Sequence, residues 1–313
     1  MRVSFLIPLF NCLPLTQAML ASLQATLPAG LDHEIILIDD GSTDGTRAWL
    51  QTLNTTPGSS LRVVLNDRNL GYAATNNRAA ASATGDFLVL LNNDLVLTPR
   101  WLEPMLAAHA TLGSRAGIIG NVQRSVATGA IDHTGIVIDE KGKPVHDRHL
   151  PRFAHPLKIV PAVTGACLLI KRDPWQSLGG FDTAFVNGGE DVDLCLRLRR
   201  RGLTVAVAQH SLILHHVSAS AGRKARDEQN SRLLALRWRP DLSILACRNW
   251  SRAHLRRIAS EPGSAPPSLH DVIAAIQVIP HALGLTRRPP FVAVRSVSDA
   301  FDTEVARWQA LLD

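Results

Sequence analysis

The sequence predicts an α/β protein built on a parallel sheet with helices on both faces. In the N-terminal half, short runs rich in Leu, Ile and Val alternate with segments that have helical spacing or many alanines. The apolar runs are continuous, which is typical of parallel strands that are buried on both faces. Each run ends in polar or turn residues. These three observations indicate a Rossmann-like architecture, in which ligands bind beyond the carboxyl ends of the strands.

The elements of this architecture follow in order along the chain. We expect strands at residues 3–8, 34–39, 61–66 and 86–91, and helices between them at 15–25, 45–53 and 73–83. The second half is less regular, with strands expected at 117–139, 162–172 and 203–215. A helix is expected at 191–201, because its apolar residues share one side and Gly202 follows as a stop. A Pro/Ser-rich break at 261–268 precedes a final helical segment at 269–313.

Length and composition limit the possible domain organisation. The chain has 313 residues, of which 46% are hydrophobic and 19% charged, so a disordered or fibrous protein is not expected. This length suits one large α/β core, expected at residues 1–220, with a basic, mainly helical extension at 221–313. No apolar run approaches the roughly 18 residues that cross a bilayer, and the start MRVSFLIPLF is interpreted as a first strand and not a signal peptide. Four cysteines without a CxxC pair indicate a reducing compartment, the cytoplasm.

The net charge of +6 is concentrated in one stretch. Residues 222–257 contain ten Arg or Lys and three Asp or Glu, which is a net charge of +7. Such a stretch suits an anionic membrane face or a phosphorylated acceptor, and a solvated helix surface is the alternative interpretation. Few aromatic residues accompany the charge, so a nucleic-acid-binding module is poorly supported.

The first chemistry-bearing motif is IDDGSTDGT at residues 38–46. It places Asp39 and Asp40 at the end of an expected strand, where carboxylates can accept hydrogen bonds from a base or a ribose hydroxyl. The structural alternative is that Asp or Ser caps the next helix. Pro8 and Asn11 lie at the end of the first strand and are further candidate donor-binding residues. No GxGxxG follows that strand, so a dinucleotide cofactor is not supported.

The second motif is LLNNDL at residues 90–95. Asn92 and Asp94 stand two residues apart after an apolar strand, and oxygen ligands of this kind suit Mg²⁺ or Mn²⁺ bridging a diphosphate. A polar turn is the alternative. The histidine pair His215 and His216, at the end of another expected strand, could supply a further ligand to the metal.

The third motif is GGEDVDLCLRLRRRG at residues 188–202. Glu190 and Asp191 follow two glycines at an expected helix start. Acidic residues at this position often only cap the helix. A Gly-flanked helix start can also present a carboxylate to a cleft as a general base, with Asp191 the better candidate.

Taken together, these residues resemble the family-2 glycosyltransferases of the GT-A fold, most closely the bacterial rhamnosyltransferase-like members. The match runs from about residue 3 to residue 223. It comprises, in order, IPLFN, ILIDDGSTDGT, NLGYAATNN, GDFLVLLNND, AVTGACLLIKR, GGFDTAF, GGEDVDLCLRLRRRG and LHHVSASAG. Each motif alone is modest evidence, but eight in sequence order are highly specific.

The resemblance implies roles for individual residues. Donor-side residues would be Pro8, Asp39 and Asn69 at the base and ribose, with Gly71 and Asn77 lining the donor side. Asp94 resembles the metal-binding Asp of the DxD motif, and Asn92 replaces the first Asp of that motif as a donor contact. Asp191 resembles the catalytic base, with Glu190 beside it. His215 fits the strand-end histidine better than His216, because the family spacing places a Ser five residues later, here Ser220.

The implied reaction is a single displacement with inversion at the anomeric carbon, from a UDP- or TDP-sugar to a glycan or lipid-linked acceptor, with Mg²⁺ or Mn²⁺. Gln229 and Arg232 give QxxR, but Leu233 stands where processive synthases carry Trp, so single addition is expected. The setting would be cell-surface polysaccharide synthesis by a cytoplasmic enzyme that contacts the membrane through residues 222–257. The alternatives are a non-catalytic nucleotide-sugar-binding homologue and a sugar-phosphate nucleotidyltransferase, although the PLFNCLP segment lacks the latter's phosphate loop.

Overall fold

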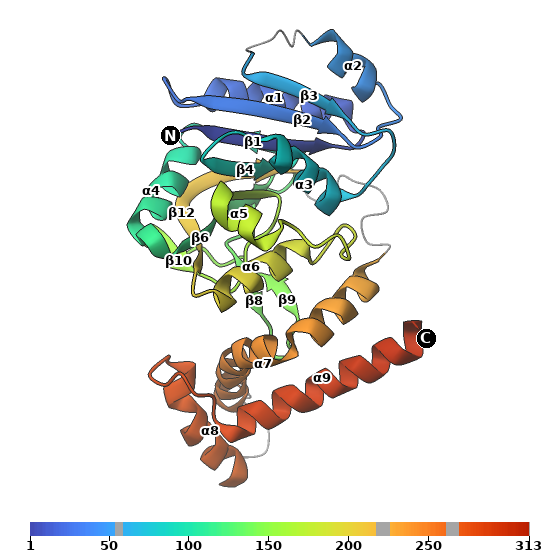
Figure 1. Ribbon diagram of the computed structural model, residues 1–313. Helices are drawn as coiled ribbons and strands as arrows, with labels where there is room; N and C mark the ends of the chain where they lie inside the picture. Colours follow the sequence, from blue (N-terminus) through green and yellow to red (C-terminus); the bar gives the residue numbers. More distant parts are fainter. Residues whose placement is uncertain (54–58, 217–225, 261–268, 313) are drawn as a thin grey trace. The chain divides into compact units, whose positions relative to one another are not determined.

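The computed structural model describes residues 1–53, 59–216, 226–260 and 269–312. It divides into two compact units (Figure 1). The first comprises Met1–Ile136 and His146–Arg226, and the second comprises Val137–Val145 and Asp227–Asp313. A short internal segment therefore belongs with the C-terminal helices, in addition to the extension that we placed at residues 221–313.

Ten strands of the described residues form one mixed sheet in the first unit. The strands are β1 (Val3–Leu9), β2 (His33–Asp39), β3 (Leu61–Leu65), β4 (Phe87–Leu91), β5 (Leu95–Leu97), β6 (Ala116–Ser125), β7 (Ile131–His133), β10 (Leu157–Ile159), β11 (Cys167–Lys171) and β12 (Thr204–His215). Their order is β10-β12-β6-β11-β4-β1-β2-β3, with β5 paired to β12 and β7 paired to β6. The first four strands of the sequence are parallel neighbours, as predicted.

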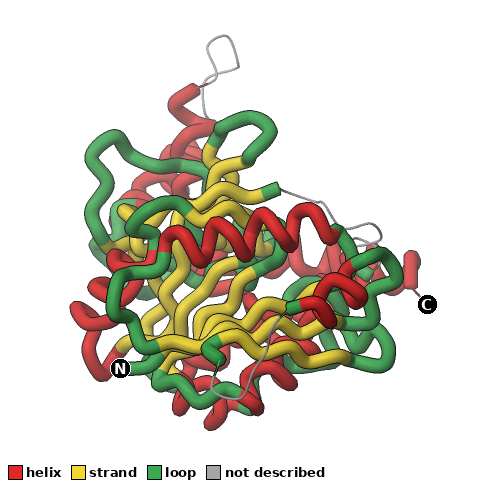
Figure 2. The backbone as a smooth tube through the Cα atoms, turned by 90° about the horizontal axis from the view of Figure 1, so that it is seen from above, coloured by secondary structure: helices red, strands yellow, loops and turns green. Residues whose placement is uncertain are grey.

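Helices cover both sides of this sheet (Figure 2). They are α1 (Leu13–Thr26), α2 (Thr46–Thr52), α3 (Tyr72–Ser82), α4 (Leu102–Leu112), the 3₁₀ turn η1 (Gly113–Arg115), α5 (Arg172–Leu178) and α6 (Glu190–Arg200). The main core forms where Phe5, Ile7 and Leu9 of β1 meet buried apolar residues of α1 and α4. The opposite face of β1 and β2 packs against α3 through small alanines, which let this helix lie close to the strands.

Two of the strands expected in the second half differ from the structure. The expected strand at 117–139 is three strands, β6, β7 and β8. A tight turn, in which Gly129 N donates to the Ser125 carbonyl, ends β6, and Gly135, which has a positive φ, separates β7 from β8. The expected strand at 162–172 begins only at Cys167. Before Cys167 only Ala162 pairs with a strand, in an isolated bridge to Ile136, while Gly165 and Ala166 contact two motif segments.

In the described residues the second unit contains three helices and most of a hairpin, whose end residues Ile136 and His146 belong to the first unit. The helices are α7 (Asp227–Ser260), α8 (Leu269–Ala282) and α9 (Phe291–Leu312), and the hairpin strands are β8 (Ile136–Ile138) and β9 (Pro144–His146). The final helical segment is two helices, because Gly284 with φ 81° and the pair Pro289-Pro290 interrupt it.

The hairpin is held to the helices by specific contacts. Asn249 donates to the Ile138 carbonyl at 2.6 Å, and Lys143 pairs with Glu304 at 2.9 Å. A Cβ on Gly142 would overlap the ring of Phe301, so only glycine fits there. No helix among the described residues has the length and apolar character that crossing a membrane requires.

Candidate active site

Polar loops converge at the carboxyl ends of β1, β2, β3 and β4. The loop after β1 and the loop after β2 are joined by Asn11, whose backbone N–H donates to Ser42 Oγ at 2.8 Å and whose side-chain oxygen accepts from Thr43 N at 2.8 Å. Pro8 lies within β1, opposite Ile38 of β2. The two predicted donor-side residues of the first strand are therefore next to the 38–46 motif.

Asp39 is fully buried and has a structural partner that the sequence analysis missed. Its Oδ2 accepts from Arg47 Nε at 3.0 Å and lies 2.9 Å from Arg47 Nη2, while Oδ1 accepts from Ser42 N at 3.2 Å. The ion pair holds the carboxylate in place at the end of β2. The signal for this pair was an Arg eight residues after the Asp, in the following helix.

Asp40 organises the loop that follows β3. Its Oδ1 accepts from Asn66 Nδ2 and Leu70 N, each at 2.8 Å, and its Oδ2 accepts from Gly71 N at 3.0 Å. Gly41 allows the two loops to touch, since a Cβ there would lie 2.7 Å from the backbone nitrogen of Asn69. The structure therefore shows Asp40 bracing the loop that carries the predicted donor residues Asn69 and Gly71.

Asn69 and Asn77 occupy different environments. Asn69 is exposed on the loop, and its Oδ1 accepts from Gly71 N at 3.0 Å. Asn77 lies on α3, and its amide makes two hydrogen bonds with the backbone of Phe181, at 2.8 and 2.9 Å. The amide of Asn77 thus connects α3 to the segment between α5 and α6.

The LLNNDL motif forms the turn between β4 and β5. Asn92 N donates to the Ala166 carbonyl at 2.9 Å, and its Oδ1 is buried without a hydrogen-bond partner among the described residues. Asp94 lies 3.3 Å from His215, measured from Oδ1 to Nε2, because β5 pairs with the end of β12. His216 contributes its backbone N–H to the Asp94 carbonyl at 3.0 Å. Ser220, on which the choice between these histidines partly rested, lies outside the described residues.

The Asp94–His215 pair fits a divalent metal. Both side chains are at most 10% exposed, yet Asp94 Oδ1 and both ring nitrogens of His215 lack hydrogen-bond partners among the described residues. Buried polar atoms without partners are costly, and a bound cation would satisfy the Asp94 oxygen and one ring nitrogen of His215. In the part of the chain that the structure describes, no third His, Cys, Asp or Glu completes a metal-binding group. Mg²⁺ and Mn²⁺ commonly take their remaining ligands from water and substrate phosphates.

Asp191 stands at the start of α6 and is held by two backbone N–H groups. Gly165 N donates to Oδ2 and Val192 N to Oδ1, each at 2.8 Å. Glu190 is 5% exposed and accepts from Gly188 N at 2.7 Å, so it turns back to the glycine segment before the helix. Asp191 is half-buried and is therefore the more accessible of the two carboxylates.

The irregular Gly165-Ala166 segment brings the motifs together. Gly165 binds Asp191 through its N–H, and its carbonyl accepts from the hydroxyl of Tyr72 at 2.8 Å. Ala166 accepts from Asn92, as described above. Tyr72 directly follows the loop that Asp40 braces. A continuous chain of contacts therefore links the 38–46 motif, the loop after β3, the LLNNDL turn and Asp191. Tyr72, the only tyrosine of the chain, is a site residue that sequence reasoning missed.

His133 on β7 is a second residue that sequence reasoning missed. It is fully buried, its ring packs edge-on against His146 at 4.8 Å, and neither ring nitrogen has a hydrogen-bond partner among the described residues. Burial lowers the pKa of His133 well below its usual range, and His146, Lys158 and His215 add to this effect. Burial therefore favours the neutral form of this side chain.

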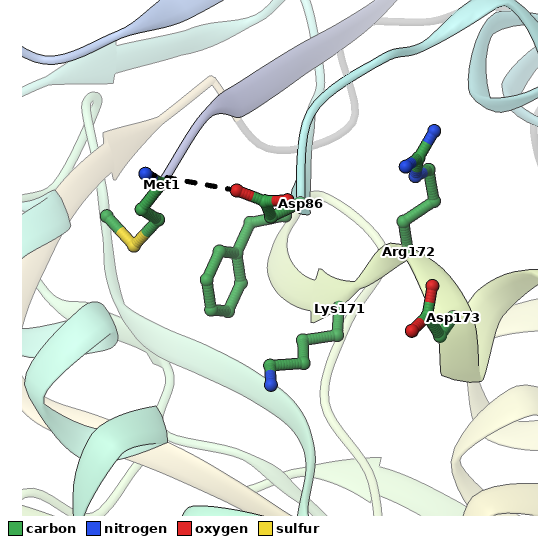
Figure 3. A pocket seen from close by; sticks show the side chains of 6 residues that line it. Met1, Asp86, Lys171, Arg172 and Asp173 are labelled. Carbon is green, nitrogen blue, oxygen red and sulfur yellow. Dashed lines mark ion pairs between the residues drawn. The ribbon is translucent and has the colours of Figure 1, made fainter.

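A small cleft lies at the other end of the sheet (Figure 3). Its volume is about 330 Å³, and it is lined by Met1, Asp86, Phe87, Lys171, Arg172 and Asp173. These residues stand at the amino ends of β1 and β4 and around the end of β11. None of the predicted site residues lines this cleft, so we do not assign the chemistry to it.

The sheet order and the strand-end site define a GT-A fold. A solved structure of similar architecture is the mannosyltransferase PcManGT from Pyrobaculum calidifontis, in complex with GDP-Man and Mn²⁺. The TM-score is 0.52 and the sequence identity is 21%, over 99% of this chain and 78% of that one. A family model described as Glycosyl transferase family 2 matches residues 4–178. The chain belongs to this family.

Two curated relatives indicate the part of the family concerned. The chain is 34% identical over 184 residues to the O-antigen biosynthesis protein RfbC of Myxococcus xanthus. The aligned region covers 56% of this chain and 14% of the relative. It is 28% identical over 250 residues to the N-acetylglucosaminyl-diphospho-decaprenol L-rhamnosyltransferase of Mycobacterium tuberculosis, covering 71% and 78% respectively. Rhamnosyltransferase-like members are therefore among its relatives, although the match spans only a small part of the Myxococcus protein.

Proposed function

We propose that the protein transfers a sugar from a nucleoside-diphosphate sugar to a hydroxyl acceptor, in a single addition with inversion at the anomeric carbon. The observation that carries this proposal is the buried pair Asp94 and His215, 3.3 Å apart and without hydrogen-bond partners among the described residues. A diphosphate leaving group needs its charge neutralised at such a point.

The donor would lie over the converging strand ends. The nucleoside side of this site would comprise Pro8, Asn11, Asp39 and Asn69. Gly71 follows on the loop after β3, and Asn92 belongs to the LLNNDL turn. The buried, unpartnered Oδ1 of Asn92 supports a role as a donor contact. Asp40 and Asn77 support the site by holding the loop after β3 and the segment before α6. Whether the donor is a UDP- or a TDP-sugar is part of the test below.

Asp191 would act as the general base. In the reaction, the acceptor oxygen forms a bond to the anomeric carbon, the bond to the diphosphate oxygen breaks, and Asp191 receives the acceptor proton. Gly165 and Val192 hold the carboxylate in one orientation for this transfer. Glu190 lies beside it at the helix start. A Mg²⁺ or Mn²⁺ ion held by Asp94 and His215 would neutralise the departing diphosphate.

The acceptor in this proposal is a glycan or a lipid-linked intermediate of cell-surface polysaccharide synthesis. The mycobacterial relative, whose name states a diphospho-decaprenol acceptor, supports this class of substrate. We place the enzyme in the cytoplasm at the inner face of the membrane, with residues 222–257 as a basic contact. All four cysteines are free, which supports a reducing compartment. Residues 217–225, which include the start of the basic stretch, lie outside the described residues.

The test is a panel of UDP-, TDP- and GDP-sugars, each offered with Mn²⁺ and an undecaprenyl-diphosphate-linked acceptor. We expect one donor class to release nucleoside diphosphate only when acceptor and metal are both present. Product anomeric configuration, read by NMR, checks inversion. No turnover with any donor, with the wild type equal to Asp191→Asn, would favour a non-catalytic homologue. Family membership already favours sugar transfer over nucleotidyl transfer.

A further inference from the structure

Helix α8 is apolar on two opposite faces. One face carries Ala274, Val278 and Ala282, which are at most 5% exposed and pack within the helical unit. The other carries a row of exposed apolar residues: Leu269 at 76%, Val272 at 39%, Ile273 at 47%, Ile276 at 64% and Ile279 at 41%. Their spacing of three and four residues places them on one side of the helix. This second face has the composition of a buried surface but is open to solvent.

The segment after α8 extends this surface. Leu283 is 68% exposed, Leu285 76%, Phe291 79% and Val294 41%. We call the exposed residues of 269–295 the α8 surface. A run of exposed apolar side chains this long is uncommon on a soluble protein unless something covers it. The scattered exposed apolar residues of the first unit, such as Phe153, do not form such a run.

Charge indicates what covers the α8 surface. Arg287, Arg288 and Arg295 are exposed among its apolar residues, and no acidic residue occurs between Asp271 and Asp299. Exposed apolar side chains next to arginines are the pattern of a helix that lies in the interface of an anionic bilayer. A second copy of the chain fits less well, because a two-fold contact would bring these arginines against each other.

We propose that the α8 surface docks the protein on an anionic lipid bilayer, with the apolar row of α8 inserted among the acyl chains and the three arginines at the headgroups. The surface differs from the basic stretch 222–257. The described part of that stretch has only Leu236 and Ile244 as exposed large apolar residues, and one of its arginines, Arg239, already pairs with Asp302 at 2.6 Å. The idea that this docking brings the enzyme to a lipid-linked acceptor rests on the proposed function. The binding of the α8 surface to lipid does not depend on that function.

The experiment uses the full chain and vesicles of phosphatidylglycerol mixed with phosphatidylcholine, compared with phosphatidylcholine alone, read by co-sedimentation. Wild type is expected to bind the anionic vesicles and to bind neutral ones at least about tenfold more weakly. Ile273→Asp with Ile276→Asp should weaken binding by about tenfold or more, because both side chains are exposed and would enter the bilayer. Arg287→Glu with Arg288→Glu should do the same at low salt. Phe153→Asp, in the first unit and 90% exposed, is the matched control and should bind like wild type.

Four outcomes would overturn the proposal. The first two concern wild type, if it fails to bind anionic vesicles or binds neutral vesicles equally well. The third is an α8 double variant that binds anionic vesicles like wild type. The fourth is a loss of binding that occurs only in the α7 variant Arg256→Glu with Arg257→Glu. Light scattering adds a check, since dimers that become monomers in the α8 variants without any vesicle binding would assign the surface to a second copy. Circular dichroism confirms folding. Ile273 and Ile276 are not among the proposed site residues, so the variants should retain transfer to a detergent-solubilised acceptor. Conversely, a chain that is inactive with every donor could still bind vesicles, which separates a failure of the proposed function from a failure of this proposal.

Discussion

The backbone N–H of Gly165 donates a 2.8 Å hydrogen bond to the Oδ2 of Asp191, although the two residues are 26 positions apart in the sequence. The same glycine accepts the Tyr72 hydroxyl through its carbonyl. A Cβ on Gly165 would lie 3.0 Å from that hydroxyl oxygen, so the close approach favours glycine. One irregular segment thus positions the proposed base against the donor-side loop.

Asp191→Asn should abolish sugar transfer while leaving the donor bound. The amide keeps an oxygen that can accept from Gly165, but it cannot take the acceptor proton, so kcat should fall by about 10²–10⁴. The measurement is nucleoside-diphosphate release at saturating donor, with donor affinity measured by calorimetry. Asp173→Asn, an exposed acid in the first turn of α5, is the control and should keep full activity. Equal rates for wild type and Asp191→Asn would remove Asp191 from this role.

Asp94→Asn and His215→Ala should each weaken the binding of the metal ion that the reaction requires. Loss of one of two protein ligands should raise the Mn²⁺ concentration for half-maximal activity by roughly 100-fold. Titration of Mn²⁺ into protein with nucleoside diphosphate gives a second readout that does not need turnover. His216→Ala is the comparison, because His216 reaches Asp94 through its backbone alone in the described contacts. A larger effect at His216 than at His215 would contradict this assignment.

Tyr72→Phe tests positioning of the base through Gly165. Removing the hydroxyl leaves the Gly165 carbonyl without this donor and should lower the free energy of unfolding by about 1 kcal/mol. Because Gly165 also holds Asp191, kcat should fall by about tenfold with little change in donor affinity. Thermal unfolding and steady-state kinetics on one preparation separate the two effects. A stability loss with unchanged kcat would show that Tyr72 has a purely structural role.

Glu34 should make the stability of the first unit depend on acid pH. Burial raises the pKa of this carboxyl, but hydrogen bonds from Ser4 and Thr84 and the charge of Arg62 outweigh burial, so the pKa lies below its ordinary value of 4.5. The folded state then holds its proton less tightly than the unfolded state does. The stabilisation is complete above about pH 4.5 and is lost as the pH falls through the folded-state pKa.

Glu34→Gln should therefore unfold at a lower urea concentration than wild type at neutral pH. Its free energy of unfolding should be lower by about 1–3 kcal/mol, and this difference should shrink in acid. The matched control is Asp32→Asn, whose side chain is 63% exposed in its ion pair with Arg2 and which should change stability little. A Glu34→Gln difference that stays constant down to the acid transition would show that the charge of Glu34 contributes nothing.

The sequence by itself determined the parallel half of the sheet and the positions of its polar strand ends. Continuous apolar runs bounded by polar residues permit few other structures, because such strands must be covered on both faces. The same pattern located Asp39, Asp94 and Asp191, since each follows or begins an element that periodicity reveals. The short antiparallel strands and α4 and α5 were not predicted, because they lack a strong periodic signal and depend on pairing with distant segments.

Only the tertiary structure decided which of these polar residues touch. Arg47 satisfies Asp39, Asp40 braces the loop after β3, and Tyr72 reaches Asp191 through Gly165, in contacts that span from 8 to 93 residues of sequence. Local spacing carries no information about such contacts, since they form only when separate strands and loops are packed together. For the same reason the sequence showed the charge of residues 222–257 but not the exposed apolar row of α8, because burial of one face and exposure of the other depends on how that helix packs.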